Sequence, residues 1–443
     1  MMKALDKLRR RKSGEPDERP PAPTSWKRTL IVIWITEFVA IIGFAMVMPF
    51  LPFYVQELGV SDPNQVKFWS GLLMSGQAIM MAIFAPIWGS LADRYGRKLM
   101  LERAIFGATI SLTLMGFVKT PQQLLVLRMI QGCLTGTVAA ATTLVAGVVP
   151  RERSGFALGL LQMSIFAGVS VGPLVGGVIA DTLGYRSAFF FTGACLFASG
   201  LGVTFFVHED FKRPQSEPGA GRSHWWDGLA MVLRSRDMLL VLSARLMTRT
   251  GARIVMPVLP LFVATLLPPS ARVATMTGIV TGAGAAASSV GAAVLGRTGD
   301  QIGHRRVLLA SAVTAAVFYA AQAAVTNVTQ LILLQFCVGA ALAGTISSLT
   351  ALLATRAPEG RQGAVYGIDT SVVAGANALG PMMGASLAVV LGNRATFLVA
   401  AGVLALAAVV INWMLPRSGE LGDERGQPSK LSPCQPVKVG RPG

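Results

Sequence analysis

The octapeptide MPFLPFYV at residues 48–55 returns as MPVLPLFV at residues 256–263, an offset of 256 − 48 = 208 in a chain of 443 residues. Further landmarks recur at an offset of 207 or 208; they are Gly89 and Gly296, Pro150 and Pro358, Gly172-Pro173 and Gly380-Pro381, and Gly184 and Gly392. One repeated octapeptide has little weight, but several landmarks in one register indicate that a single unit has been duplicated. We therefore predict two structural halves of similar architecture.

Composition indicates what surrounds this chain. Hydrophobic residues make up 52% of it and charged residues 14%, whereas roughly a quarter of a soluble domain is charged. The chain has too few charged residues to cover a surface that faces water, and we therefore expect a lipid bilayer around most of it. The net charge of +17 lies in the N-terminal tail, from Lys3 to Arg28, and in short segments between apolar runs. Because no groove-sized basic block is present, we expect no nucleic-acid partner.

Twelve mostly apolar stretches are long enough to cross a bilayer, which takes about 20 residues of helix. They cover residues 30–55, 69–91, 99–118, 122–147, 155–180, 187–207, 238–267, 275–296, 306–325, 329–354, 362–390 and 395–415. The predicted fold class is an all-α membrane protein with twelve transmembrane helices in two pseudo-symmetric six-helix halves. Two parallel repeats of this kind enclose a central cavity near the bilayer midplane, and rocking of one half against the other opens that cavity to alternate sides.

The charged segments between the apolar stretches predict the orientation. If the N-terminal tail is cytoplasmic, so are the C-terminal tail and the basic segments 93–98, 151–153, 212–236, 297–306 and 356–361. The other side keeps five isolated basic residues, namely Lys67, Lys119, Arg186, Arg272 and Arg394. This asymmetry predicts two cytoplasmic termini. The predicted organisation is a basic tail (1–28), a first half (29–207), a cytoplasmic linker (208–237), a second half (238–415) and a C-terminal tail (416–443).

The segment after the second apolar stretch reads GSLADRYGRK at residues 89–98. It combines a glycine turn, basic residues and one acid, and it resembles the signature loop of the major facilitator superfamily at Gly89, Asp93, Arg94, Gly96, Arg97 and Lys98. The resemblance implies that these residues form a cytoplasmic gate. There, Asp93 would face a helix N-terminus of the other half, where an anion gains about 0.3–1 kcal/mol. A solvated charged turn is the alternative.

The fourth stretch carries RMIQG at residues 128–132, which places Arg128 inside the membrane, beyond the outer end at Pro121. A guanidinium at this depth is costly unless it meets a carboxylate, a carbonyl or water. Arg128 resembles the membrane arginine of the superfamily, and this implies a role in proton coupling. An arginine that only bonds backbone carbonyls is the alternative.

The fifth stretch reads GVSVGPLVGG at residues 168–177. Its proline removes a backbone hydrogen bond and bends a helix, and its glycines allow a neighbouring helix to approach closely. The spacing of Gly168, Gly172, Pro173 and Gly176 is similar to a motif of proton-linked exporters within the superfamily. The resemblance implies export rather than uptake.

The first stretch contains the acid Glu37. Since helical steps of three and four residues return to one side, Glu37 shares a face with Ile41, Phe44 and Met48. A carboxylate beside Phe and Met on a cavity wall can bind a proton and a solute in turn. The alternative is a glutamate at the inner edge, tied to Lys27 or Arg28. Asp369 in the eleventh stretch is a second candidate proton carrier.

The seventh stretch departs from the repeat, because at the offset of 208 Glu37 corresponds to Arg245. Arg249 and Arg253 follow at intervals of four residues, so the three arginines share one helical face. We predict that Arg249 and Arg253 line the substrate cavity together with Phe44 and Met48, and favour neutral or anionic solutes. Bonds to backbone carbonyls or to Asp369 are the alternative.

Several motifs are missing from the chain. It has no GxxxxGK[ST] phosphate loop, and its histidines, His208, His224 and His304, all fall in predicted cytoplasmic segments. We therefore expect no nucleotide-driven pumping, no metal, no cofactor and no enzymatic activity.

The resemblance extends over nearly the whole chain and is greatest to the twelve-helix drug:proton antiporter branch, in particular to multidrug resistance exporters of the bacterial inner membrane. It implies a transporter that exchanges protons for small amphipathic molecules. We expect this transporter to be a monomer. One alternative is a dedicated exporter of an anionic metabolite such as a siderophore. Another is a non-transporting membrane sensor or scaffold, although the linker of about thirty residues is short for a signalling domain.

Overall fold

The computed structural model describes residues 26–149, 153–207, 209, 235–268, 270–356 and 362–414. Over these residues the chain is helical and no strand is present. The first half contains α2 (Trp26–Val47), η1 (Met48–Phe50), α3 (Leu51–Glu57), α4 (Pro63–Tyr95), α5 (Arg97–Met115), α6 (Pro121–Leu134), α7 (Thr137–Val148), α8 (Ser154–Leu183) and α9 (Tyr185–Phe206). The second half contains α11 (Arg236–Ile254), α12 (Leu259–Thr265), α13 (Val273–Ile302), α14 (His304–Ala323), α15 (Val328–Arg356), α16 (Gln362–Leu391) and α17 (Asn393–Met414).

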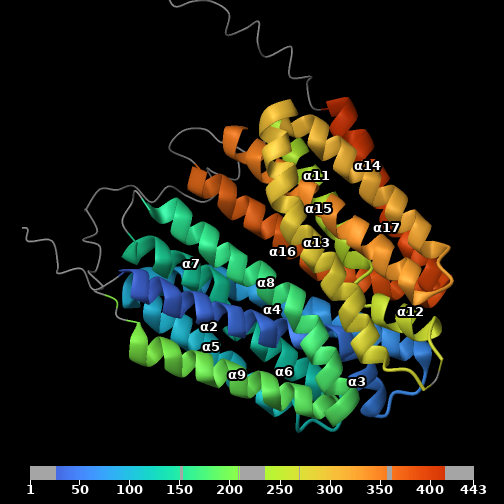
Figure 1. Ribbon diagram of the computed structural model, residues 1–443, viewed down its shortest axis with the longest axis horizontal. Helices are drawn as coiled ribbons and strands as arrows, with labels where there is room; N and C mark the ends of the chain where they lie inside the picture. The colour runs from blue at the N-terminus through green and yellow to red at the C-terminus, as the bar shows by residue number, and fades with distance from the viewer. Residues whose placement is uncertain are drawn as a thin grey trace, which may run out of the picture.

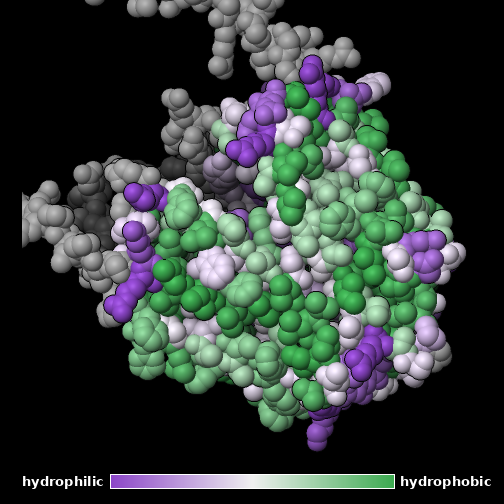
Figure 2. Space-filling model, in the orientation of Figure 1, coloured by the Kyte–Doolittle hydropathy of each residue, from purple (hydrophilic) through white to green (hydrophobic). Residues whose placement is uncertain are grey.

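Each of the twelve predicted spans coincides with one helix or with consecutive helices. Eleven helical segments are long and apolar enough to cross a membrane. The remaining span is α5, which is less apolar because Arg97, Lys98, Glu102 and Arg103 occupy its first two turns. Figure 2 shows hydrophobic residues over the middle of the visible face and hydrophilic residues near its ends. The predicted all-α membrane fold is confirmed.

The repeated proline pair breaks one helix in each half. The first predicted span, over 30–55, is not continuous, because α2 ends at Val47 and α3 begins at Leu51. Likewise α11 ends at Ile254 and α12 begins at Leu259. Proline has no backbone N–H and collides with the preceding turn, so two prolines three residues apart interrupt the hydrogen-bond ladder. The start of α12 lies 259 − 51 = 208 residues after the start of α3, so the helix boundaries follow the same offset as the sequence repeat.

Glycine turns join the longer helices at equivalent places. Gly96 lies between α4 and α5 with φ of 101°, and its counterpart Gly303 lies between α13 and α14 with φ of 95°. Gly184 and Gly392 form the same kind of turn at the other end of the molecule, with φ of 86° and 85°. Only glycine adopts this left-handed region without a steric cost. The tight turn predicted at Gly96 is therefore present. We call the end that carries Gly184 and Gly392 the outer end.

Four long helices form the interface between the halves. α8 packs against α13, and α4 packs against α16. Glycines bring the backbones together near the outer end: a Cβ added to Gly177 would collide with the backbone of Ala274, and one added to Gly278 would collide with the carbonyl of Pro173. In Figure 1 the two sets of helices lie together near α3 and α12 and diverge toward the opposite end.

Candidate functional site

Glu37 lies in the middle of α2 and is completely buried. Neither of its carboxylate oxygens has a hydrogen-bond partner among the described residues. The side chain of Thr137, the first residue of α7, lies beside the carboxyl group without a well-formed hydrogen bond. Lys27 and Arg28 form no ion pair with it, so the alternative of an inner-edge glutamate tied to these cations finds no support in the described part of the chain.

The surroundings of Glu37 depend on a break in the fourth span, whereas the apolar run over 122–147 predicts one continuous helix. α6 ends at Leu134, and Gly136, with φ of 138°, precedes α7. The freed carbonyls at the end of α6 are satisfied by other helices. Trp88 Nε1 donates to the Cys133 carbonyl at 2.6 Å, and Arg103 Nη1 donates to the Leu134 carbonyl at 3.0 Å.

Arg103 also stacks on Trp88, with its guanidinium carbon 3.5 Å from the ring centroid. This cation–π contact orients both donors toward the end of α6. Two side chains from α4 and α5 thus replace the missing helical bonds, as a break at membrane depth requires. Neither residue was among the predicted site residues; the signal in the sequence was Arg103, a charged residue within the predicted span over 99–118.

Arg128 lies on α6 and is almost completely buried. Its Nη1 donates to Gln77 Oε1 at 2.7 Å and to Gln131 Oε1 at 3.4 Å. The other two guanidinium nitrogens, Nε and Nη2, have no partner among the described residues. Among the described residues, Arg128 is therefore held by neutral amides and forms no ion pair with a carboxylate.

The glycines of the predicted exporter motif press α8 against α2. A Cβ at Gly168 would meet the Ile41 side chain, one at Gly172 would meet Ala45 and the Ile42 carbonyl, and one at Gly176 would collide with the Met46 backbone. The neighbouring Pro173 offers its carbonyl face to α13 in the other half. One helix therefore packs closely against α2 on one side and the opposite half on the other.

Replacing Gly176 by valine is expected to destabilise the protein. The new Cβ would overlap backbone atoms, which cannot move aside as a flexible side chain can, and overpacking of this kind costs about 1–3 kcal/mol. We expect a lower unfolding temperature and a lower yield of folded protein in detergent. Gly159→Val on the same helix is the matched control, since a Cβ there meets no atom within 4 Å. Equal losses in both variants would contradict close packing at Gly176.

A cluster of three arginines and one acid occupies α11 and α16. Arg245 Nε lies 2.7 Å from Asp369 Oδ1, and both side chains are almost buried. Arg245 also donates to the Thr350 hydroxyl at 3.0 Å. Arg253 donates to Asn377 Oδ1 at 2.8 Å and to the sulfur of Met256 at 2.8 Å. Asp369 and Arg253 are thus both held by neighbouring side chains.

Arg249 differs from the other two arginines. It is half-buried, and it forms no hydrogen bond or ion pair within the described part of the chain. Its charged neighbours are Arg245, Arg253 and Asp369. Three cations against one anion leave this cluster with a net charge of +2 when all four groups are ionised. Arg249 is the member that remains available to an outside anion.

The two apolar residues of the predicted cavity lie at the C-terminal end of α2 and at the start of η1. Phe44 is half-buried on α2 and packs against the core of the first half. Met48 is also half-buried and begins η1, a turn that contacts α8 and, across the interface, α13. The segment that begins with Met48 therefore reaches the second half, whereas the packing of Phe44 is within the first half.

The signature loop is tied to its own half. Arg97 Nη1 donates to the Thr143 carbonyl at 2.9 Å, and Lys98 Nζ donates to the Thr204 carbonyl at 3.0 Å. The backbone N–H groups of Arg97 and Lys98 both bind the Glu209 carboxylate, which caps the start of α5. Arg94 is exposed, and a Cβ at Gly89 would meet nothing within 4 Å. The side chain of Asp93 lies outside the described residues.

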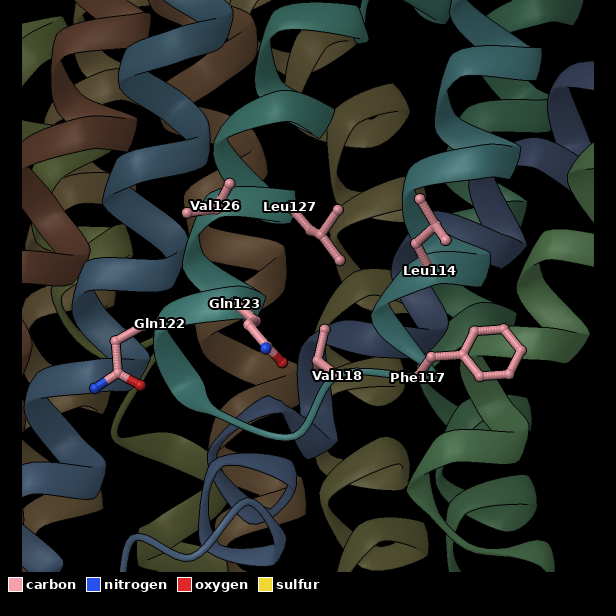
Figure 3. Close-up of a pocket in the computed structure, with 7 residues that line it drawn as sticks. All are labelled: Leu114, Phe117, Val118, Gln122, Gln123, Val126 and Leu127. Atoms are coloured by element: carbon pink, nitrogen blue, oxygen red, sulfur yellow. The ribbon is translucent and has the colours of Figure 1, made fainter.

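Figure 3 shows a groove between α5 and α6 near the outer end. It is lined by Leu114, Phe117, Val118, Gln122, Gln123, Val126 and Leu127. The lining has no charged residue and includes none of the predicted site residues. The groove therefore belongs to the outer surface of the first half rather than to the candidate site.

Comparison with known proteins identifies the family. The sequence model described as Major Facilitator Superfamily matches residues 33–266 and 241–441. The chain is 36% identical over 400 residues to multidrug resistance protein MdtG of Enterobacter lignolyticus, covering 90% of this chain and 94% of that protein. It is 34% identical over 405 residues to the protein of the same name in Rahnella sp., covering 91% and 98%.

Solved structures share the fold at low sequence identity. The nucleoside transporter NupG is 12% identical, with a TM-score of 0.72 and coverage of 88% of this chain and 99% of that one. A bacterial homologue of the human lysosomal transporter Spinster, solved in an inward-facing and occupied conformation, is 14% identical, with a TM-score of 0.73 and coverage of 88% and 97%. The family model matches most of the chain, and the two multidrug resistance proteins are 36% and 34% identical to it. The chain is therefore a multi-pass membrane protein that belongs to the major facilitator superfamily.

Proposed function

We propose that this protein exports small amphipathic molecules across the bacterial inner membrane in exchange for protons. The observation that carries the proton part of the proposal is the buried Glu37 carboxyl group, which has no hydrogen-bond partner among the described residues although it lies in a membrane-spanning helix. The relatives named multidrug resistance proteins support the choice of solute. They favour multidrug export over a dedicated exporter of one anionic metabolite.

Glu37 is the proposed proton carrier. An ionised carboxylate buried without a partner costs several kcal/mol, and a protonated one does not carry this penalty. We therefore assign a neutral Glu37 to the conformation described here. Opening of its surroundings to water would allow the proton to leave toward the cytoplasm while a solute binds. Asp369 is less suited to this role, because Arg245 lies 2.7 Å away and balances its charge.

Arg128 is proposed to assist this proton transfer. Its guanidinium is buried, with two nitrogens free of partners among the described residues, so it raises the local positive potential in the first half. A cation that comes close to a carboxyl group during the transport cycle would make the loss of its proton easier. Asp93 and the signature loop remain the proposed cytoplasmic gate, with both chain termini on that side and a monomer as the working unit.

The energy source distinguishes this proposal from other transport mechanisms. Purified protein in liposomes is expected to accumulate a fluorescent drug only while an imposed pH gradient persists. Drug movement and proton movement are measured together, with a dye on each. Transport that survives an uncoupler and stops without ATP would contradict exchange with protons.

The solute is proposed to bind between the halves, against Phe44, Met48 and Arg249. Arg249→Gln is expected to lower transport of an organic anion by about tenfold to hundredfold, because a hydrogen bond to a charged group contributes roughly 1.5–3 kcal/mol. An organic cation of similar size is expected to gain or stay unchanged, because a repelling charge is removed.

Arg249→Lys is the matched control, since it keeps the charge and is expected to retain most anion transport. The measurement is the ratio of initial rates for the two solutes in the same liposomes. Equal losses for anion and cation in Arg249→Gln would assign Arg249 a structural role and remove it from the solute site.

A further inference from the structure

Two polar contacts cross between the halves at the outer end, and neither involves the signature loop. Asp181 of α8 accepts hydrogen bonds from the backbone N–H groups of Ala274, at 3.3 Å, and Thr275, at 2.7 Å, at the start of α13. Lys67 of α4 donates from Nζ to the carbonyl of Ala388, at 3.0 Å, in the last turn of α16. Each contact joins the first half to the second.

The two contacts are related by the sequence repeat. Thr275 lies 275 − 67 = 208 residues after Lys67. Ala388 lies 388 − 180 = 208 residues after Ala180, which directly precedes Asp181. Equivalent helix ends therefore meet at two places: the C-terminal end of α8 meets the start of α13, and the C-terminal end of α16 meets the start of α4. At the first place the polar side chain is Asp181, which belongs to the helix that ends there. At the second place it is Lys67, which belongs to the helix that begins there.

The charges match the helix ends that they touch. The N-terminal end of a helix carries partial positive charge and its C-terminal end partial negative charge. Asp181 meets the start of α13, where the N-cap residue, Arg272, provides no side-chain hydrogen bond of its own. Lys67 meets the end of α16. Both electrostatic contacts are therefore attractive, although one uses an acid and the other a base.

Asp181 is poorly placed for its own helix. It lies in the last turn of α8, where an acid faces the negative end of the helix and reduces helix stability. Lys67 lies one turn from the start of α4, where a cation faces the positive end of that helix, and its Nζ also donates to Asn64 Oδ1 of the same helix at 3.3 Å. The helix ends that attract these two charges lie in the opposite half, so contact between the halves accounts for an acid at the end of α8 and a base at the start of α4.

Contacts between the halves are concentrated at the same end. Gly71 of α4 lies against Pro381 and Ala385 of α16, close to the Lys67 contact, and Gly177 lies against Ala274, close to the Asp181 contact. Farther along the same helices, a Cβ added to Gly89, Gly159 or Gly367 would meet nothing within 4 Å. Figure 1 shows the helices of the two halves diverging in that direction.

We infer that Asp181 and Lys67 form an outer latch, a pair of helix-end contacts that holds the outer face closed in this conformation and that must separate when the outer face opens. The inference deepens the proposed function, since it rests on alternating access, but it requires neither a proton nor a particular solute. Asp181 and Lys67 are thus positioning residues for the transport cycle.

The test measures the distance between the halves directly. In a background without the native cysteines, Ser61→Cys and Thr326→Cys place spin labels on exposed outer residues of the first and second halves. Double electron–electron resonance in lipid nanodiscs then reports the populations with the outer face closed and open. We expect mainly the shorter distance with the latch intact.

Asp181→Asn and Lys67→Met are each expected to raise the ratio of open to closed populations by about twofold to thirtyfold, the range set by charge–helix-end interactions. The double variant is expected to show the product of the two changes, because both contacts bias one rigid-body equilibrium. Asp181→Lys is expected to exceed Asp181→Asn, because it places a cation at the positive end of α13.

Asp62→Asn is the matched control. Asp62 lies at the same end, but it caps its own helix by accepting from the Asn64 N–H at 3.1 Å, and no hydrogen bond or ion pair joins it to the described residues of the other half. We expect its distance distribution to match that of the unmodified protein. Unchanged distances in Asp181→Asn, Lys67→Met and Asp181→Lys, or an equal shift in Asp62→Asn, would overturn the latch.

The distance measurement separates failure of the latch from failure of the proposed function. Shifted distances together with uncoupled transport would retain the latch and reject proton exchange. Unshifted distances together with normal proton-driven export would reject the latch and retain proton exchange.

Discussion

Glu37→Gln is expected to reduce proton-driven export to the level of protein-free liposomes while the protein stays folded. Glutamine has nearly the size of glutamic acid and is neutral, so it imitates the protonated side chain that we assign to the conformation described here. It cannot release a proton, and an exchange cycle that depends on this release stops. Exchange of solute for solute across the membrane, which needs no proton release, is expected to continue.

The measurement compares two assays on one preparation. The first follows drug accumulation under a pH gradient together with the proton flux, and the second follows exchange of labelled for unlabelled solute without a gradient. Glu57→Gln is the control acid, because Glu57 lies on α3 in an exposed ion pair with Arg186 at 3.0 Å. Normal proton-linked accumulation by a well-expressed Glu37→Gln protein would reject Glu37 as the carrier.

Asp369→Ala is expected to lower the free energy of unfolding by about 3–5 kcal/mol, the usual cost of leaving one partner of a buried ion pair alone. The loss is large because removal of the carboxylate leaves Arg245, Arg249 and Arg253 on one helix face without an anion among the described residues nearby. Arg245→Met is expected to cost a comparable amount, since it leaves Asp369 without the cation that lies 2.7 Å away.

The double variant Arg245→Met with Asp369→Leu is expected to be more stable than either single variant, because two apolar side chains can replace a buried pair. Thermal unfolding in detergent measures all three against the unmodified protein. Asp300→Ala is the matched control, because Asp300 pairs with His304 at 3.2 Å but is 73% exposed, and exposed pairs contribute about 0–1 kcal/mol. Losses that simply add in the double variant would show that Arg245 and Asp369 do not stabilise each other.

Local features of the sequence were sufficient for the framework. Apolar runs of sufficient length predict the spans, because a helix is the simple way to satisfy backbone hydrogen bonds in lipid. The register of the repeat predicts two halves. Positions such as Gly96, where only glycine fits the backbone, were also predictable, and so was the close packing along Gly168, Gly172 and Gly176, because residues at intervals of four lie on one helix face.

Breaks of two kinds show where prediction from the sequence reaches its limit. The proline pairs at 49–52 and 257–260 contain a local reason for ending α2 and α11, although the first and seventh spans predicted from apolar length run through them. The break between α6 and α7 contains no proline. It depends on Trp88 and Arg103, which come from two other helices and bind the freed carbonyls.

The partners of the charged residues were decided by the tertiary structure alone. The sequence marks Glu37, Arg128, Arg249, Arg253 and Asp369 as notable because a charge in lipid is costly wherever it lies. It does not show that Asp369 meets Arg245, that Arg253 meets Asn377, or that Asp181 caps a helix of the other half. Helix formation depends on neighbours within four residues, whereas pairing of charges depends on which faces of distant helices are packed together. The sequence therefore determined the spans and their repeat, and only the packing of the helices decided which of the described charges are paired and which are not.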